Sequence, residues 1–286
     1  MSSKTAAGIG LGFRIAMADA FLEQKPPEVG WVEVHPENYV GRGGRYATNL
    51  DAVAEHYPVV THGLTLSLGS TEPVDADFAD EVRSFLRRVD TPWHSDHLCF
   101  GGAGGAFAHD LLPLPFTEET RRTAVQRIRE LRDRLQIELA FENVSYYAPQ
   151  GSDGLDEARL CADVLEDADC RILLDVNNVY VNSQNFGFDP RAFIDLIPPK
   201  RVVQMHVAGH LVRDDGIRID THGEAVCDDV YELLAYALER TGPVPVLLER
   251  DNNVPELEVM LAEVRRLNAI YNAATAKAVP IEGRAP

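Results

Sequence analysis

The chain has 286 residues, of which 45% are hydrophobic and 25% charged, so it is long enough to form one α/β barrel with a large core. Its 45 acidic residues outnumber 27 basic ones and give a net charge of −18, which argues against nucleic-acid binding because that needs a basic surface. The four cysteines form no CxxC pair and no apolar run could span a membrane, which argues against thioredoxin-like sites, zinc ribbons and membrane proteins and fits a reducing cytoplasm.

Short apolar runs alternate with longer amphipathic stretches along the chain, which predicts strands and helices in turn. Eight runs predict strands: Leu11–Ile15, Trp31–His35, Val59–Gly63, Trp93–Leu98, Ile137–Phe141, Arg171–Val176, Val202–Val207 and Val244–Leu248. Six stretches predict helices: Asp77–Arg88, Thr117–Leu135, Leu155–Glu166, Pro190–Ile197, Glu224–Arg240 and Pro255–Tyr271. Strands that alternate with helices pair in parallel, so we expect a single (β/α)8 barrel of the TIM type.

Two segments are set apart from this barrel. Gly101–Gly105 follows the fourth predicted strand without the Lys-Ser/Thr of a phosphate loop, so it predicts a mobile lid or a connector. We expect the barrel to occupy residues 1–275 and a C-terminal tail to occupy 276–286. Within that tail, Ile281–Arg284 resembles a protease-cleavage sequence and takes no part in the fold argument.

Residues that can bind metal ions recur where the last six predicted strands end. They are His62, Asp96, His97, Glu142, Asn143, Asp175, Asn177, Asn178, His206, His210, Glu249 and Asp251, with Asp220 and His222 in the loop after the seventh strand. The C-terminal ends of barrel strands meet at one mouth, so we expect these side chains to lie together. Buried carboxylates repel one another and cost several kcal/mol each to desolvate, which favours a cluster of bound cations.

The ligand types narrow the choice of metal. Imidazole, carboxylate and amide groups with no thiolate at a strand end point to iron, manganese or zinc. The number of candidate ligands favours two or three ions. Such a site can activate water, as in hydrolases and isomerases, or dioxygen, as in non-haem iron enzymes, and the spacing does not decide between them.

Eight short segments between about Gly8 and Tyr271 stand in an order that is characteristic of one family. The segments are Glu33–Tyr39, Thr61–Gly63, Ser95–Leu98, Phe141–Asn143, Leu174–Asn178, Met205–His210, Asp220–His222 and Leu248–Asp251. Together they resemble the multinuclear non-haem iron-dependent oxidative enzymes. This family includes the iron enzyme of methanobactin biosynthesis and the enzymes that modify bufferin peptides.

The resemblance implies a cytoplasmic oxidoreductase that uses two or three iron ions (Fe2+/Fe3+) and dioxygen. It implies oxidative modification of cysteine residues in a ribosomally synthesised precursor peptide, with thiooxazole or oxazolone–thioamide products. A small partner protein, encoded nearby, is expected to help deliver the peptide. No nucleic acid or membrane partner is expected, and the oligomeric state is left open, a homodimer included.

Carried over residue by residue, the resemblance assigns one iron to His62, His97 and Glu142. A second iron is assigned to Asp175, His206 and Glu249, with Glu142 as a bridge, and Glu142, Asp175 and His206 are expected to act in catalysis. A third iron is assigned to Asp220 and His222 with an amide of Asn178 or Asn177. Asn177 shares a strand face with Asp175, whereas Asn178 does so only if the strand has ended. Residues expected to support the ligands or the substrate are Glu37, Asn38, Asp96, Asn143, Asn177 and His210.

Two other classes of function remain open at this point. One is a metal-dependent barrel hydrolase or isomerase, of the xylose isomerase or endonuclease IV kind, which shares the fold and the ligand types but is indifferent to oxygen. The other is a metal-binding scaffold or peptide-binding module without turnover.

Overall fold

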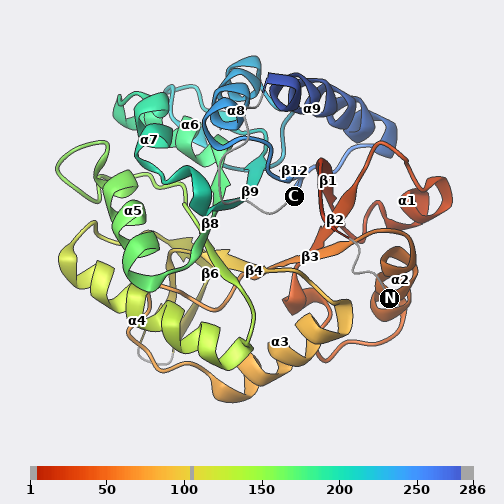
Figure 1. Cartoon of the computed structure of the whole chain (residues 1–286), viewed down its shortest axis with the longest axis horizontal. Helices are drawn as coiled ribbons and strands as arrows, with labels where there is room; N and C mark the ends of the chain where they lie inside the picture. The colour runs from red at the N-terminus through yellow and green to blue at the C-terminus, as the bar shows by residue number, and fades with distance from the viewer. Residues whose placement is uncertain (1–4, 104–105, 278–286) are drawn as a thin grey trace.

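A closed barrel of eight parallel strands forms the centre of the protein, whose structure is a computed structural model that describes residues 5–103 and 106–277. The strands follow the order β1-β12-β9-β8-β7-β4-β3-β2 around the barrel, and helices surround them (Figure 1). They are β1 (Ile9–Gly12), β2 (Trp31–Val34), β3 (Val59–His62), β4 (His94–His97), β7 (Leu139–Glu142), β8 (Arg171–Asp175), β9 (Val202–Val207) and β12 (Val246–Leu248). The predicted (β/α)8 barrel is confirmed.

Nine α-helices lie within the part of the chain that the structure describes, and all six predicted helices are among them. They are α1 (Ala18–Gln24), α2 (Arg45–His56), α3 (Ala76–Val89), α4 (Glu118–Leu135), α5 (Asp156–Ala168), α6 (Val176–Phe186), α7 (Pro190–Leu196), α8 (Asp228–Thr241) and α9 (Leu257–Lys277). Capping side chains fix several starts: Asp75 accepts from the N–H groups of Asp77 and Phe78, and Thr117 accepts from that of Thr120. Helix α9 continues two residues into the segment expected as a tail, and 278–286 lie outside the described residues.

Some predicted boundaries are wrong, for local reasons. The first strand ends at Gly12, three residues before its predicted end. The fifth predicted strand begins at Leu139, two residues later than predicted, because Gln136 adopts the left-handed conformation that ends α4. The strand ends at Glu142, one residue later than predicted. The predicted helix that starts at Glu224 begins at Asp228.

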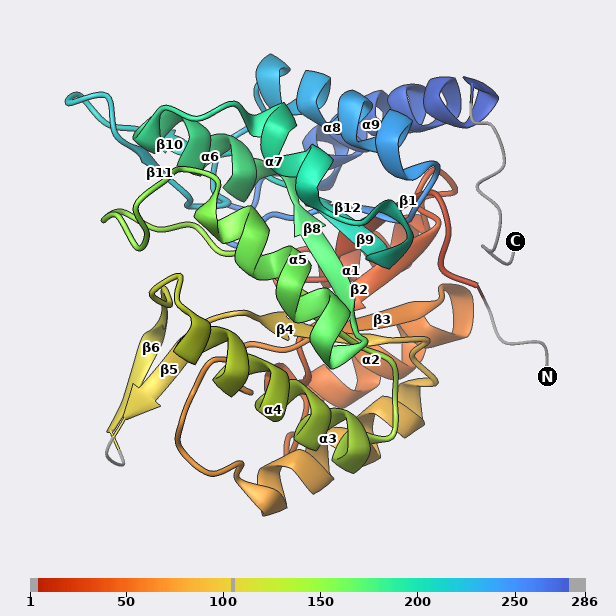
Figure 2. The same cartoon turned by 60° about the vertical axis from the view of Figure 1, so that its left-hand side comes forward.

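Two antiparallel hairpins follow the C-terminal ends of β4 and β9. One joins β5 (Phe100–Ala103) to β6 (Ala106–Leu112), and the other joins β10 (Leu211–Val212) to β11 (Arg218–Ile219). Both lie at the same end of the barrel, on the left in Figure 2. Gly101 and Gly102 belong to β5, so the loop predicted there is wrong, whereas Gly104 and Gly105 lie outside the described residues.

The barrel interior changes from apolar to polar along several strands. Trp31, Val60 and Leu247 belong to one apolar cluster. Two residues further along the chain lie Glu33, His62 and Glu249, which are also buried, the last of them directly after β12. Because every second residue of a strand faces the same side, the alternation places a polar layer above an apolar one inside the barrel.

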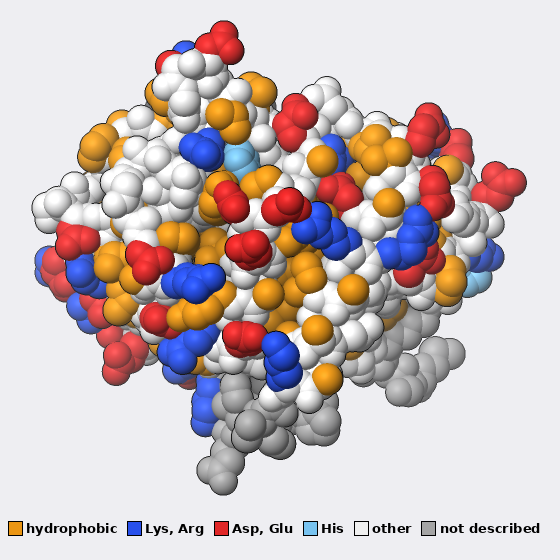
Figure 3. Space-filling model, turned by 90° about the horizontal axis from the view of Figure 1, so that it is seen from above, with side chains coloured by type: hydrophobic (Ala, Val, Ile, Leu, Met, Phe, Trp, Pro, Cys, Tyr) orange, Lys and Arg blue, Asp and Glu red, His pale blue; other side chains and the backbone are white. Residues whose placement is uncertain are grey.

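The outer surface carries mixed charge. Figure 3 shows one face on which basic and acidic side chains are interspersed with small apolar areas rather than gathered by sign. Among the described residues, no helix combines the length and the hydropathy needed to cross a membrane.

Candidate metal centre

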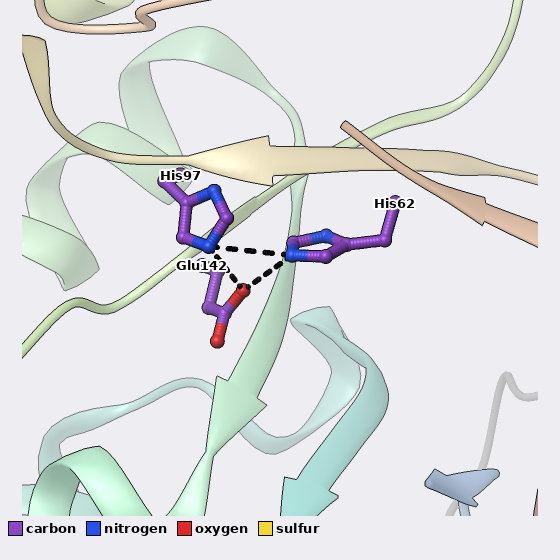
Figure 4. Close-up of side chains that lie close together, drawn as sticks. All are labelled: His62, His97 and Glu142. Atoms are coloured by element: carbon purple, nitrogen blue, oxygen red, sulfur yellow. Dashed lines mark hydrogen bonds and ion pairs between the residues drawn. The ribbon is translucent and has the colours of Figure 1, made fainter. Parts of the chain in front are cut away.

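Three adjacent strands bring His62, His97 and Glu142 together at their last residues (Figure 4). Glu142 Oε2 lies 3.0 Å from His62 Nε2 and 3.3 Å from His97 Nε2, and the two nitrogens are 3.3 Å apart. All three side chains are buried, yet Glu142 Oε2 makes no hydrogen bond. Three potential ligand atoms thus converge on one point, which forms a cradle that a cation fits. We call these residues the first group.

A second group lies beside the first and consists of Glu142, Asp175, His206 and Glu249. One potential ligand atom from each lies within 4.8 Å of the others. His206 Nδ1 is 3.0 Å from Glu249 Oε2 and 3.7 Å from Glu142 Oε1. Glu142 therefore directs one carboxylate oxygen toward each group, which is the geometry of a bridging ligand.

Burial and close contact shift the pKa values of the residues in the two groups in both directions. Burial raises the pKa of Glu142 to about 7, against the opposing effect of His97, and raises the pKa of Asp175 well above its ordinary value. Burial also lowers the pKa of His62 to about 4, helped by the neighbouring His97. For His97 burial acts downward as well, but the carboxylates of Glu142 and Asp96 outweigh it and raise its pKa to about 9.

The buried atoms without a hydrogen-bond partner concentrate in this cluster. They include Glu142 Oε2, Asp175 Oδ2, Asn178 Oδ1, His206 Nδ1 and His222 Nε2. Buried polar atoms are nearly always satisfied in folded proteins, so a concentration of unsatisfied lone pairs indicates a missing ligand. The donor set of imidazole, carboxylate and amide fits a first-row transition metal.

Asp220 and His222 lie next to the second group, where a third ion was expected. His222 Nε2 is 2.8 Å from Asp220 Oδ1 and 4.0 Å from Asp175 Oδ2. Its Nδ1 lies 3.2 Å from Glu249 Oε2. This pair therefore extends the cluster toward solvent.

The two neighbouring amides differ in what they contact. Asn177 is engaged at both ends, because its Nδ2 donates to Asp220 Oδ1 and its Oδ1 lies 2.8 Å from His210 Nδ1. Asn178 donates through Nδ2 to the carbonyl of Asn143 and leaves its Oδ1 free. Strand β8 ends at Asp175 and α6 begins at once, which is the condition under which Asn178 can turn toward the cluster. The free oxygen makes Asn178 the better candidate ligand.

The other predicted supporting residues hold backbone in place. Asn143 pairs with both the N–H and the carbonyl of Asp175. Asp96 accepts from the N–H groups of His97 and Leu66, and lies 3.7 Å from His97 Nδ1. A Cβ at Gly63 would come within 2.4 Å of Asp96 Oδ2, so this contact requires glycine.

Glu37 and Asn38 lie in the turn after β2. Glu37 accepts hydrogen bonds from the N–H of Leu64 and the hydroxyl of Thr65, which anchors the loop after β3. Asn38 donates its backbone N–H to the carbonyl of His35. These contacts are structural, and the predicted role of the two residues toward substrate stays a prediction.

Sequence reasoning missed three residues at the cluster, namely the buried Glu33 and His35 and the partly buried Arg14. His35, Glu249 and Asp251 form a further group of metal-capable side chains. Arg14 Nη2 lies 3.1 Å from Glu249 Oε1 and 2.6 Å from Asp251 Oδ1, so a guanidinium already supplies positive charge there. The signal for Glu33 was an acid between apolar residues of a predicted strand, whereas Arg14 gave none.

Comparisons of this chain with known proteins identify the family to which its sequence is similar and the solved structures that share its fold. A family model described as "RiPP precursor modification enzyme MbnB/TglH/ChrH" matches residues 8–272. Similar relatives are UPF0276 proteins of Shewanella loihica (38% identical), Anaeromyxobacter sp. (43%) and Pseudomonas aeruginosa (41%). Each alignment covers 94% of this chain, and 96%, 94% and 94% of the respective relatives.

Solved structures with a similar fold include a xylose isomerase-like TIM barrel protein from Mycobacterium smegmatis in complex with magnesium. It is 13% identical with a TM-score of 0.59, and the match covers 96% of this chain and all of that chain. Another is 3-keto-D-glucoside 4-epimerase from E. coli, at 14% identity and a TM-score of 0.58, covering 91% of this chain and 99% of that chain. At such identities the likeness shows the fold alone.

Proposed function

This chain belongs to the MbnB/TglH/ChrH family of enzymes that modify precursors of ribosomally synthesised and post-translationally modified peptides (RiPPs), and we propose that it oxidises cysteine residues in such a precursor with iron and dioxygen. The products are of the thiooxazole or oxazolone–thioamide type. The observation that carries the proposal is the pair of buried groups that share Glu142 at the barrel mouth. Family membership supports a peptide substrate.

Two or three irons are held by the residues that converge at the mouth. His62, His97 and Glu142 hold one, and two histidines with one carboxylate are the donor set of non-haem iron(II) oxygenases that keep open positions. The second group holds another, with three carboxylates that suit a more highly charged ion. Asp220 and His222 hold the third with the amide of Asn178.

When bound, iron supplies dioxygen activation and a place for the cysteine thiolate. The residues of the chain position this chemistry: Glu142 fixes the spacing of the two groups, and Asp175 and His206 hold the second one rigidly. Burial of all three keeps bulk water from the reacting cysteine.

The setting of the reaction is part of the same proposal. A small partner protein presents the peptide, and the reaction takes place in the cytoplasm, where the free cysteines Cys99, Cys161, Cys170 and Cys227 stay reduced. That residues 1–275 act as one domain with 276–286 as a tail, and whether the protein is a homodimer, stay predictions.

The test is an anaerobic reconstitution. The protein, loaded with ferrous iron, is incubated with the cysteine-containing peptide and the small protein encoded beside its gene, with and without dioxygen, and the peptide mass is measured. We expect a mass change that requires both iron and dioxygen and disappears when the peptide cysteines are replaced by serine. A change that proceeds without dioxygen, or equally well with magnesium, manganese or zinc, would support a barrel hydrolase or isomerase instead.

A further inference from the structure

His206, at the end of β9, is contacted from behind by a carboxylate on the opposite side of the barrel. Glu33 Oε2 of β2 lies 3.1 Å from His206 Nε2, and both side chains are fully buried. Strands β2 and β9 are separated by β1 and β12 in the barrel, so the contact crosses the interior. The other ring nitrogen, Nδ1, faces Glu142 and Glu249 of the second group.

The position of Glu33 is fixed by two further side chains. Gln204 Nε2 donates to Glu33 Oε2 at 2.6 Å. The indole N–H of Trp93 donates to Gln204 Oε1 at 2.9 Å, which fixes the orientation of that amide. A chain of hydrogen bonds therefore runs from the indole of Trp93 through the amide of Gln204 to the carboxylate of Glu33.

We propose that Glu33 is a positioning residue that selects the metal-binding nitrogen of His206. Its carboxylate accepts the Nε2–H, and the lone pair of Nδ1 is thereby left for the ion in the second group. A carboxylate behind a metal-binding imidazole fixes its tautomer and orientation and makes it a stronger ligand. The inference rests on the metal centre proposed above.

The first group is built differently at the same point. His62 directs its Nε2 toward the first group, and its Nδ1 lies 2.9 Å from the hydroxyl of Ser95. A neutral hydroxyl therefore backs the histidine of the first group, whereas an anion backs the histidine of the second. Removal of the Glu33 charge should affect the second group alone.

One alternative arrangement uses the same atoms. Gln204 Nε2 is also 2.8 Å from His206 Nε2 and could donate to it. The ring would then carry its proton on Nδ1 and could not bind an ion there. The two arrangements predict opposite effects of Gln204→Met. In the proposed one this variant loses a contact that positions Glu33 and should weaken iron binding slightly, whereas in the alternative it removes the donor that keeps the proton on Nδ1 and should strengthen iron binding.

The experiment titrates the metal-free protein anaerobically with ferrous iron enriched in 57Fe and follows each site by Mössbauer spectroscopy. For Glu33→Gln we expect the iron affinity of the second group to fall about 10- to 100-fold, while that of the first group stays within about twofold.

Two further variants serve as comparisons. Gln204→Met should lower the iron affinity of the second group by a smaller factor, and Ser95→Ala should lower the iron affinity of the first group only. The melting temperature of metal-free Glu33→Gln should change little, because the amide oxygen of the variant can keep the contacts of Oε2 to Gln204 and His206, and Oε1 has no hydrogen bond to lose.

Each other outcome counts against the inference. Unchanged affinity, equal loss at both groups, or a larger loss in Gln204→Met than in Glu33→Gln would overturn it. A clear fall in the melting temperature of metal-free Glu33→Gln would show a structural role instead. A wild-type protein with no iron in the second group would overturn the proposed function itself, whereas normal wild-type loading with an unaffected Glu33→Gln would overturn this inference alone.

Discussion

The protein buries carboxylates in two regions, near Glu157 and at the barrel mouth, and the two regions differ in the contacts and the pKa shifts of these carboxylates. Glu157 of α5 is buried alone, with a single described hydrogen bond, from Asn182 Nδ2 at 3.3 Å. Beside it is a cavity of about 10 Å³ whose other lining is largely apolar. Burial raises the pKa of Glu157 to about 8, and the hydrogen bond from Asn182 offsets only part of that effect. A lone buried carboxylate of this kind simply keeps its proton.

At the barrel mouth the carboxylates face one another and several histidines. Burial raises the pKa of Asp175 far above its ordinary value, whereas His206 and His222 overcome the effect of burial and hold that of Glu249 far below its own. Protons alone therefore leave unsatisfied lone pairs and opposed charges within one small space. The comparison teaches that clustering, rather than burial, marks a carboxylate as a metal ligand.

Glu142→Ala should have the largest effect on the barrel mouth and none on the Glu157 region. It removes the only ligand common to both groups, so iron content should fall at two sites and peptide turnover should fall at least about 100-fold. Iron per chain and turnover are measured on anaerobically prepared protein. Glu157→Gln is the matched control, a change at a buried glutamate that should leave iron content as in wild type. Unchanged stoichiometry in Glu142→Ala would contradict the bridge.

Metal removal should destabilise the mouth and not the Glu157 region. An ion present at about 1,000 times its dissociation constant stabilises the folded state by about 4 kcal/mol, which corresponds to a melting temperature shift on the order of 10 °C in a chain of this size. Calorimetry of the wild type before and after anaerobic chelation measures the shift, which should be much smaller in Glu142→Ala. Equal shifts in both proteins would mean that the stabilising ion binds elsewhere.

Glu157→Gln should sharpen the comparison through its pH dependence. The pKa of Glu157 in the folded protein, about 8, exceeds its ordinary value of 4.5, so the folded state binds the extra proton. This contribution to stability is complete below about pH 4.5 and is lost as the pH rises to about 8. The variant, neutral at every pH, should be more stable than wild type at pH 8 by on the order of 4 kcal/mol, with no difference in slope above pH 9. Urea unfolding at several pH values checks this, and equal stabilities at pH 8 would place a charged Glu157 in the fold.

The smallest predicted effect separates the two amides at the third position. Asn178→Ala removes the free amide oxygen and should weaken binding of the third iron about tenfold. Asn177→Ala, the adjacent control, should loosen the contact to His210 and leave iron affinity closer to wild type. Competition with a chelator of known affinity measures both variants. A larger loss in Asn177→Ala would reverse the assignment.

Much of the fold follows from local pattern. The eight strands could be predicted because apolar runs recur between amphipathic stretches. The grouping of the candidate ligands could be predicted because they lie where those runs end. Helix α6 was missed because it follows Asp175 with no turn residue between strand and helix. Helix α1 was missed because it is short, and α2 because it begins after Gly44 with no capping side chain. The hairpin at Gly101 was missed because glycines usually mark turns.

The remaining features of the site depend on contacts across the barrel. Glu33 and His206 are 173 residues apart, and Arg14 meets Glu249 across 235 residues. No periodicity encodes such a pair, and none indicates which ring nitrogen of His206 faces the cluster. These features follow only from closure of the barrel, which pairs the first strand with the last and lets side chains of separated strands meet in the interior.

The central claim is that the mouth gathers acids and imidazoles around positions that bind metal cations. Anomalous X-ray diffraction at the iron edge, from crystals of anaerobically loaded protein, tests it most directly. We predict one anomalous peak between His62, His97 and Glu142 and a second between Glu142, Asp175, His206 and Glu249. The absence of iron at both positions in fully loaded protein, or iron only at places remote from Glu142, would contradict the account.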